Sequence, residues 1–385
     1  MTQARTLTRE PKKATHLELY RQVDRICRER LRDALNPETG LFDRQIRDRT
    51  WQSTRGTEDV TSTAIALIGM HRAGVDPSLV GLDVERTLAA LVERMRKRRY
   101  PGALGLVLWA NAVWGGRPLE GVAHKVGIEL DRVAELLDTL TTMEVAWLVS
   151  GLVHEYRRST SVGARAALDV AFAVLIARLH GATALFCHAS ERAPMGHRVR
   201  RWVANFADQI YAVQAASLVA KSFDHDAALE IAERCAARLV ELQGGLGQWW
   251  WHYDPRIGEV VQGFPVYSVH QHAMAPMALL TLAAAGGTKH GRAIERSHAW
   301  IAVNELGTDM VDPLAGTIWR NIEIDERPIE RVVRQTRSVI GWATDEAGTT
   351  ATNLKVNHET RPYEWAWCLF AGALASGERR VEHVA

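Results

Sequence analysis

The chain alternates between two kinds of predicted helix, and this alternation limits its possible folds more than any other feature. Segments of the first kind are amphipathic with a charged face, which is typical of helices on the outside of a protein. They cover residues 17–35, 82–97, 122–138, 162–180, 225–243 and 289–306. Segments of the second kind carry little charge and are rich in Ala, Gly, Trp and Met, which is typical of buried helices. They cover residues 61–73, 102–114, 141–154, 205–220, 269–285 and 361–375.

Outer and inner segments in equal number predict a closed double ring, because each outer helix then leads into an inner one. Alternating strand patterns are nearly absent. The sequence therefore predicts an all-α protein with a single (α/α)6 barrel, or toroid, over residues 16–385. Residues 1–15 are polar and basic, and we expect them to form a disordered tail.

The links between the predicted helices differ in length according to their direction. Links from inner to outer helices are short, whereas several links from outer to inner helices are long. The long links cover residues 36–60, 181–204, 244–268 and 307–360. In a ring of parallel inner helices these links emerge at the rim where the inner helices begin, and long ordered loops often carry binding residues. We therefore expect the functional face at this rim.

The composition excludes several classes of protein. Apolar residues make up 47% of the chain, enough for a substantial core, and 47 basic against 45 acidic residues leave no strong field for nonspecific nucleic-acid binding. No segment approaches the roughly 20 apolar residues of a membrane span, and the N-terminus lacks the pattern of a signal peptide. Four scattered cysteines fit a reduced compartment, so we expect a cytoplasmic protein. They are Cys27, Cys187, Cys235 and Cys368.

An aromatic block follows the fifth outer segment. It begins with Trp249, Trp250, Trp251, His252, Tyr253 and Asp254. A turn pattern at 254–258 predicts a short β-hairpin near 249–263, in which Trp249 and Trp251 share one face. The tryptophans then form either a stacking wall for a ligand or a hydrophobic plug that seals the barrel. The chain holds 13 Trp against 7 Phe, an excess that an ordinary core does not need.

The second half of the block supplies candidate proton-transfer residues. His270, Gln271 and His272 fall at the start of an inner helix, where the helix dipole lowers an imidazole pKa and favours a neutral histidine base. Tyr267 and Asp254 are possible partners for these histidines. In the alternative interpretation, one histidine caps the helix and the other is packed. The spacing of the two histidines does not favour a metal site on one helix, and the sequence predicts neither a metal nor a cofactor.

Further candidate residues lie at the starts of other inner helices. A pair of carboxylates that met across the opening could act as general acid and base, with polar and aromatic neighbours as ligand-binding groups. Acidic residues are also favoured in the first turn of any helix, so each one alone is weak evidence. In the longest link, Trp319 and Arg320 form either a clamp for an anionic group or a lid. The candidates at the helix starts are Asp59, Glu144, Asp208, Gln209, Tyr211, Glu359, Arg361, Tyr363 and Glu364.

The helical hairpins, the turns with paired glycines and the aromatic block resemble the α/α-toroid proteins over residues 17–375. That superfamily includes six-hairpin glycosidases, polysaccharide lyases and sugar epimerases, as well as terpenoid cyclases and prenyltransferase subunits. The chain is also similar to a group of bacterial proteins with a GQWWWHYD…YPVYSVHQ-type block, which occurs here at 247–254 and 264–271. In that group an acidic residue follows the Gln, whereas this chain has His272, so a catalytic acid at that position would be missing.

Three functions agree with these features. The first is a carbohydrate-active enzyme that binds an acidic saccharide in the ring opening and performs hydrolysis, β-elimination or epimerisation. The second is an isoprenoid-handling toroid whose tryptophans contact apolar chains or a carbocation, although the chain lacks a DxDD proton donor. The third is a non-catalytic scaffold or regulator in a polysaccharide pathway. For a carbohydrate-active enzyme, the partner we expect is a small-molecule or oligosaccharide ligand.

Overall fold

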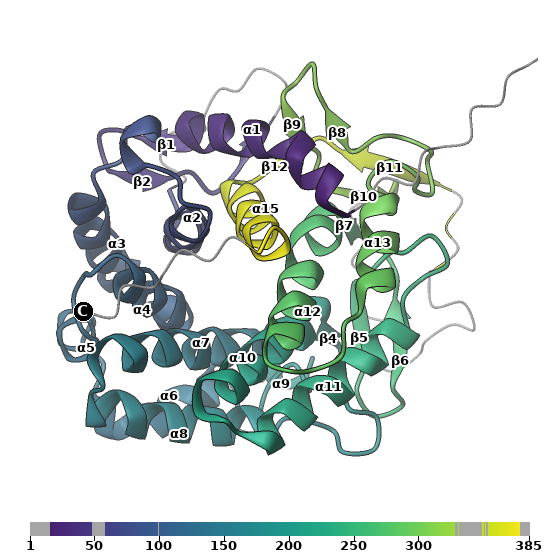
Figure 1. Cartoon of the computed structure of the whole chain (residues 1–385). Coiled ribbons are helices and arrows are strands. Elements are labelled where there is room, and N and C mark those ends of the chain that lie inside the picture. Colours follow the sequence, from purple (N-terminus) through teal and green to yellow (C-terminus); the bar gives the residue numbers. More distant parts are fainter. Residues whose placement is uncertain are drawn as a thin grey trace, which may run out of the picture.

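The computed structural model describes residues 16–47, 58–98, 100–327, 330, 349, 351 and 353–377, so the predicted tail 1–15 lies outside it. The described helices form two concentric layers, as Figure 1 shows. The inner layer consists of α2 (Val60–Arg72), α4 (Leu104–Val113), α7 (Thr142–Ser159), α10 (Phe206–Phe223), α12 (Ala275–Ala284) and α15 (Pro362–Ala375). The outer layer consists of α1 (His16–Ala34), α3 (Val84–Arg98), α5 (Leu119–Val126), α6 (Val133–Thr139), α8 (Val162–Ile176), α11 (Asp226–Glu241) and α13 (Gly291–Trp300).

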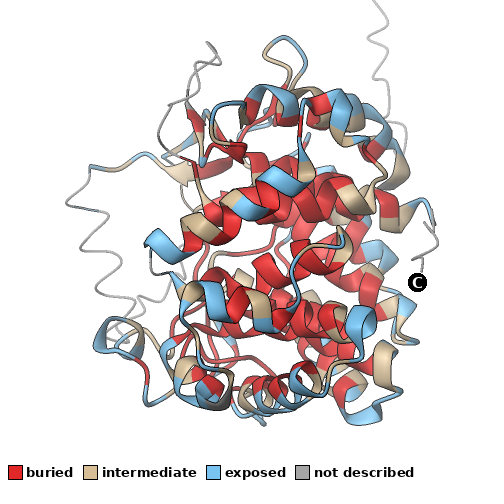
Figure 2. Cartoon of the chain, turned by 90° about the vertical axis from the view of Figure 1, so that its left-hand side faces the viewer, coloured by how far each residue is buried: buried red, intermediate tan, exposed pale blue. Residues whose placement is uncertain are grey.

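The inner layer is a closed ring. Each inner helix packs on the next along the chain, and α15 completes the ring by packing on both α12 and α2. A π-helical turn, η4 (His270–Met274), leads directly into α12. Figure 2 shows the buried residues concentrated in the middle of the molecule, with exposed residues on the outward faces. The predicted all-α toroid is therefore confirmed.

Glycines allow the inner helices to approach one another closely. Gly105 of α4 lies against the backbone of Trp147 in α7, and Gly151 of α7 lies in turn against the backbone of Gly105. Gly69 of α2 lies against the backbone of Ala366 in α15. A Cβ atom at any of these three glycines would overlap backbone atoms of the neighbouring helix, so the spacing of the ring depends on residues without side chains.

The third outer segment differs from the prediction of one helix over 122–138. Helix α5 ends at Val126, and Gly127 follows in the left-handed conformation with a φ of 72°. A left-handed glycine is a common helix terminator because it has no Cβ that disfavours this conformation. The chain continues through a 3₁₀ turn, η3 (Leu130–Arg132), into α6. The remaining short helical turns are η1 (Pro77–Val80), η2 (Pro101–Ala103) and α9 (Met195–Arg198).

Short antiparallel strands connect the long links at the rim, so that loops far apart in sequence hold one another. Strand β3 (Ile46–Arg47) pairs with β12 (Glu359–Thr360), and β4 (Ala204–Asn205) pairs with β5 (His252–Asp254). Strand β7 (Val266–Tyr267) pairs with β10 (Asn321–Ile324), which also pairs with β11 (Leu354–Asn357). Two further pairs are local: β1 (Leu35–Asn36) with β2 (Leu41–Phe42), and β8 (Val311–Asp312) with β9 (Thr317–Ile318).

The predicted hairpin near 249–263 is present. Strand β5 pairs with β6 (Glu259–Gln262), with a register shift between His252 and Tyr253 and a turn that contains Gly258 at a φ of 77°. The hairpin places the tryptophan block directly before β5, at the rim. None of the helices that the structure describes is long and apolar enough to cross a membrane.

The close helix contact at Gly105 predicts a large effect of a single methyl group. Gly105→Ala should lower the free energy of unfolding by about 1–3 kcal/mol, because the new Cβ overlaps the backbone of α7. The control is Gly121→Ala in α5, where a Cβ meets only ordinary van der Waals contacts and should raise stability by about 0.5–1 kcal/mol. Urea unfolding of both variants measures the difference. Equal effects would show that the inner helices do not depend on this contact.

Candidate functional site at the rim

The strand pairs at the rim gather residues from two of the long links and from the starts of two inner helices into one group, which we call the rim cluster. The backbone of Arg320 joins them: its carbonyl accepts a hydrogen bond from Ser268 N at 2.8 Å, and its N–H donates to the carbonyl of Glu359 at 2.9 Å. Links 244–268 and 307–360 and the start of α15 therefore meet at one residue. The rim cluster consists of Trp251, Tyr267, His270, Arg320, Glu359, Arg361, Tyr363 and Glu364.

Two arginines and two glutamates form the charged part of the rim cluster. Arg320 Nη1 donates to Glu364 Oε1 at 2.8 Å, and Arg320 Nε lies 3.6 Å from Glu359 Oε1. Arg361 Nε donates to the same Glu359 oxygen at 2.7 Å. The side chain of Arg361 keeps 20% of its surface exposed, against 10% for Arg320. Arg361 is therefore the guanidinium that a ligand from solvent can reach more easily.

The aromatic part of the rim cluster lies beside these charges. The Trp251 ring centre is 4.9 Å from that of Tyr267 and 6.2 Å from that of His270, whose plane is nearly parallel to the indole. The guanidinium carbon of Arg320 lies 4.9 Å from the centre of the Tyr267 ring. Trp251 and Tyr267 are both partly exposed. A planar or ring-shaped ligand can therefore contact an aromatic face and a guanidinium together.

The other two tryptophans of the block pack toward the outer layer. Trp249 Nε1 donates to Ser297 Oγ of α13 at 2.9 Å, and Trp250 Nε1 donates to the carbonyl of Leu242, just after α11, at 3.0 Å. Both rings are buried. The sequence predicts that Trp249 and Trp251 share one face, as either a ligand wall or a plug. In the structure their surroundings differ, because Trp249 is buried against α13 whereas Trp251 is partly exposed beside Tyr267.

Burial determines the charge states in the rim cluster. The pKa of His270 falls to about 3, first because the ring is buried and then because Arg320 and His272 lie nearby, so His270 is neutral near pH 7. Burial raises the pKa of Tyr267, although Arg320 opposes this shift. Burial likewise raises the pKa of Glu364 against the opposing charge of Arg320. The cluster thus combines a neutral imidazole, a phenol and a carboxyl that binds its proton more tightly than usual.

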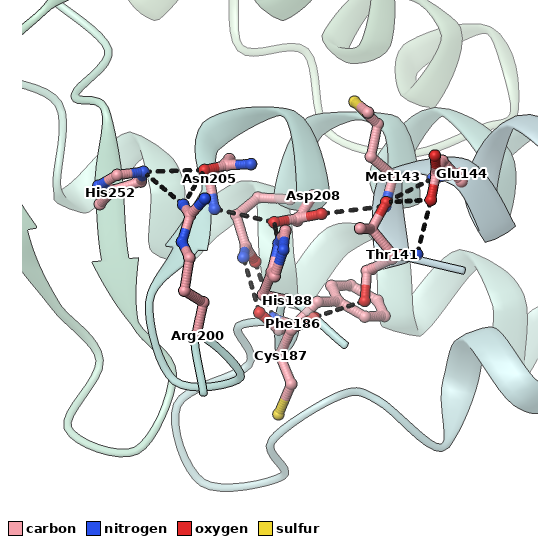
Figure 3. A network of polar contacts seen from close by, with 12 residues as sticks. Thr141, Met143, Glu144, Phe186, Cys187, His188, Arg200, Asn205, Asp208 and His252 are labelled. Atoms are coloured by element: carbon pink, nitrogen blue, oxygen red, sulfur yellow. Dashed lines mark hydrogen bonds and ion pairs between the residues drawn. The ribbon is translucent and has the colours of Figure 1, made fainter. Parts of the chain in front are cut away.

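Asp208 and His252 belong to a separate polar network, which Figure 3 shows. Asp208 Oδ2 accepts from Asn205 N and pairs with His188 Nδ1, both at 2.8 Å, while Oδ1 accepts from Met143 N at 3.0 Å. His252 Nε2 pairs with the Asn205 side chain at 2.8 Å. These contacts saturate the Asp208 carboxylate and join the starts of α7 and α10. The network therefore holds the rim together.

Glu144 and Asp59 cap helices. Glu144 accepts from Thr141 N at 2.8 Å in a capping box, and its other oxygen accepts from the Tyr100 hydroxyl at 2.7 Å. Asp59 caps α2 and accepts from Ser62 N at 3.0 Å. Tyr100 lies near both carboxylates, and after burial and Glu144, Asp59 also contributes to the raised pKa of its hydroxyl. Sequence reasoning missed Tyr100, whose only signal is its place before the Pro-Gly that opens the second inner segment.

The remaining predicted residues hold the backbone or lie in the core. The Gln209 amide bonds the N–H and carbonyl of Phe186 at 2.7 and 2.8 Å, and the Gln271 amide bridges Trp249 N and the Tyr267 carbonyl. Asp254 pairs with Arg256 across the hairpin turn at 2.6 Å. The other predicted site residues are buried or lie inside the ring. They are Tyr253, Trp319, Tyr211 and His272, the last of which lies beside Cys368.

Among the described residues, no group of three or more His, Cys, Asp or Glu side chains is arranged to hold a metal ion. Sequence comparison matches no protein-family model and no curated protein. Any assignment of function therefore depends on the fold and on the rim residues.

Solved structures match the fold over nearly the whole chain. One is an unsaturated glucuronyl hydrolase responsible for glycosaminoglycan degradation from Bacillus sp. GL1, with a TM-score of 0.61, 13% identity and coverage of 94% of this chain and 98% of that one. A GH76A α-1,6-mannanase from Salegentibacter sp. HEL1_6 gives a TM-score of 0.55 at 12% identity, covering 93% and 100%. An unsaturated glucuronyl hydrolase from Streptococcus agalactiae gives 0.57 at 9% identity, covering 94% and 92%. The chain thus shares the α/α-toroid fold of these glycosidases.

The lowered pKa of His270 predicts a contribution to acid sensitivity. An unfolded histidine takes up a proton near pH 6.5, whereas the folded ring does so only near 3. The unfolded chain therefore binds a proton that the folded chain does not, and the free energy of unfolding decreases as the pH falls between these values. His270→Gln lacks this titration. Between pH 7 and pH 4, the unfolding free energy of the variant should therefore decrease by on the order of a few kcal/mol less than that of the wild type. The exposed His124 serves as the control, and His124→Gln should follow the wild type. A wild-type pH dependence in His270→Gln would contradict the assignment.

Proposed function

We propose that this protein is a carbohydrate-active enzyme that binds an acidic saccharide at the rim cluster and hydrolyses it by acid/base catalysis. The observation that carries the proposal is the position of two partly exposed aromatic rings, Trp251 and Tyr267, beside the guanidinium of Arg320, with Arg361 joined to the same group through Glu359. We also propose that the protein is related to the bacterial proteins that carry the tryptophan block, and that it is cytoplasmic.

The proposed binding mode uses both halves of the rim cluster. The apolar face of a sugar ring stacks on Trp251, as pyranose rings commonly do on aromatic side chains. The sugar carboxylate pairs with Arg361, which is partly exposed and presents a planar set of donors. Glu359 pairs with both Arg361 and Arg320 and so holds them in place in the absence of a ligand. Specificity for an acidic sugar then follows from the arginine, and affinity from the ring contact.

Glu364 is the proposed proton donor. Glycoside hydrolysis requires a carboxyl group that stays protonated near neutral pH, and burial raises the pKa of Glu364. Glu364 would protonate the leaving oxygen, while the neutral His270, beside Tyr267, is available to accept the proton of the water that attacks the anomeric carbon. Fold neighbours named as hydrolases of unsaturated glucuronides support hydrolysis of an acidic sugar. The contacts of Asp254, Glu144 and His272 favour supporting roles for these three residues.

A second reaction deserves a test because of Tyr267, His270 and Arg320. Abstraction of a proton next to a sugar carboxylate, as in β-elimination or epimerisation, requires a cation that stabilises the carboxylate and a nearby base and acid. These three residues supply that set without a second carboxylate. Elimination yields an unsaturated product that absorbs ultraviolet light, whereas hydrolysis of a saturated saccharide yields new reducing ends without that absorbance. One product assay therefore separates hydrolysis from β-elimination.

Removal of the stacking surface should weaken binding. Trp251→Ala should raise the Kd for uronic acid oligosaccharides by the equivalent of about 1–3 kcal/mol, measured by calorimetry, because the ring contact is lost. Trp202 is the matched control: it is also partly exposed and packs on Arg201 and Arg256, outside the rim cluster. Trp202→Ala should bind as the wild type does. If Trp251→Ala kept full affinity, or both variants lost it equally, the rim cluster would not be the binding site.

Removal of the proposed proton donor should abolish turnover while leaving binding largely intact. Glu364→Gln should lower kcat by about 10²–10⁴-fold, because the amide accepts the Arg320 hydrogen bond but has no acidic proton. In the wild type, kcat should fall as the pH rises through the raised pKa of Glu364, and this limb should be missing from the residual activity of the variant. Wild-type turnover by Glu364→Gln would exclude Glu364 as the donor.

A further inference from the structure

Below the rim, aromatic side chains from four inner helices meet inside the ring. The ring centre of Tyr211 in α10 lies 5.5 Å from that of Trp147 in α7 and 6.2 Å from that of Trp367 in α15. Trp367 lies 5.8 Å from Trp109 of α4. Because α10 and α15 pack on α12 from either side, the contact between Tyr211 and Trp367 spans the ring interior. We call this group, with Gln214, the interior set.

Polar atoms of the interior set are buried without partners. Gln214 follows Tyr211 by three residues on the same face of α10, is 1% exposed, and neither its amide nitrogen nor its amide oxygen has a hydrogen-bond partner. The indole N–H groups of Trp147 and Trp367 face the Tyr211 hydroxyl, but neither reaches the geometry of a hydrogen bond. An unpaired buried amide costs stability, so such groups commonly serve a ligand or an ordered water.

The interior set is uncharged. Burial raises the pKa of Tyr211, so its hydroxyl keeps the proton. Deeper in the ring, His154 stacks on Trp109 at 4.6 Å, and its pKa falls to about 3 through burial and the neighbouring side chains of Arg157, His71 and Arg72. His154 is therefore neutral near pH 7. An anion at Gln214 would lose its hydration without a counter-ion among the residues of the interior set.

The interior set adjoins the rim cluster through Tyr363. Tyr363 precedes Trp367 by one turn on α15, so the two side chains share a face of the helix, and Tyr363 is also the residue directly before Glu364 of the rim cluster. Burial raises the pKa of Tyr363 to about 12, against the opposing charge of Arg320. A ligand with two linked units could therefore contact the charged rim and the uncharged interior at the same time.

We infer that the interior set binds a neutral sugar unit of the saccharide whose acidic unit lies at the rim cluster, an inference that rests on the proposed function. Sugar C–H faces suit the indole rings, and sugar hydroxyls can both donate to and accept from the Gln214 amide. The tryptophan N–H groups add two donors that an ether or hydroxyl oxygen can accept. The saccharide thus enters the ring with its neutral unit first and leaves its carboxylate at the rim.

Calorimetry with three probes tests this orientation. The probes are methyl glycosides of neutral hexoses, glucuronic acid, and a disaccharide of glucuronic acid with a neutral hexose. The variant Gln214→Met keeps the side-chain length and removes the amide. The variant should bind the neutral glycosides and the disaccharide at least tenfold more weakly and should bind glucuronic acid with unchanged affinity. It should also have a higher Tm than the wild type in the absence of ligand. The control is Ser217→Ala, one turn further along α10, whose hydroxyl bonds its own helix at Val213 and whose loss should change no affinity.

The outcomes separate this inference from the proposed function. If glucuronic acid and the disaccharide bind the wild type with equal affinity, or if Gln214→Met binds every probe as the wild type does, the interior set is not a sugar site and the rim proposal stands. A crystal structure of the disaccharide complex with ordered waters still bonded to Gln214 would also overturn the inference. If none of the probes binds the wild type, the proposed function itself is wrong.

Discussion

The close backbone contact between inner helices at glycine is the constraint on which the rest of the structure depends. Gly105 and Gly151 let α4 and α7 touch, and Gly69 lets α2 touch α15 where the ring closes. Because glycine has no side chain, the two helix backbones lie directly against each other at each contact. The large aromatic residues then fill the interior of the ring. A ring held at this spacing brings the starts of its inner helices to one rim, so the links before them can meet and pair.

Arg320 connects this ring to the site. Its backbone bonds Ser268 and Glu359, so it belongs to the paired strands, while its side chain bonds Glu364 of α15 and covers Tyr267. A buried guanidinium requires partners, and two carboxylates supply them. The same contacts hold the Tyr267 ring beside Trp251, while burial sets the charge states of the cluster. Structural and proposed catalytic roles therefore share one set of bonds at the rim.

The ring could be predicted from the sequence because helical periodicity and the alternation of charged and apolar helices are local signals. The hairpin near residue 258 could be predicted for the same reason, since its turn residues are contiguous. Every residue of the rim cluster was a candidate from the sequence, but the sequence could not show which candidates meet. Their meeting depends on β7 pairing with β10, which no local pattern specifies. Sequence reasoning missed Gln214, because its missing hydrogen-bond partners appear only in three dimensions.

The central claim is that an acidic sugar binds between Trp251 and Arg361. The most direct measurement is a crystal structure of Glu364→Gln, in which turnover should be blocked, soaked with a uronic acid oligosaccharide. The account predicts a sugar ring stacked on Trp251 with its carboxylate paired to Arg361. A saccharide bound at another face of the molecule, or a rim cluster that stays empty at saturating ligand concentrations, would contradict it.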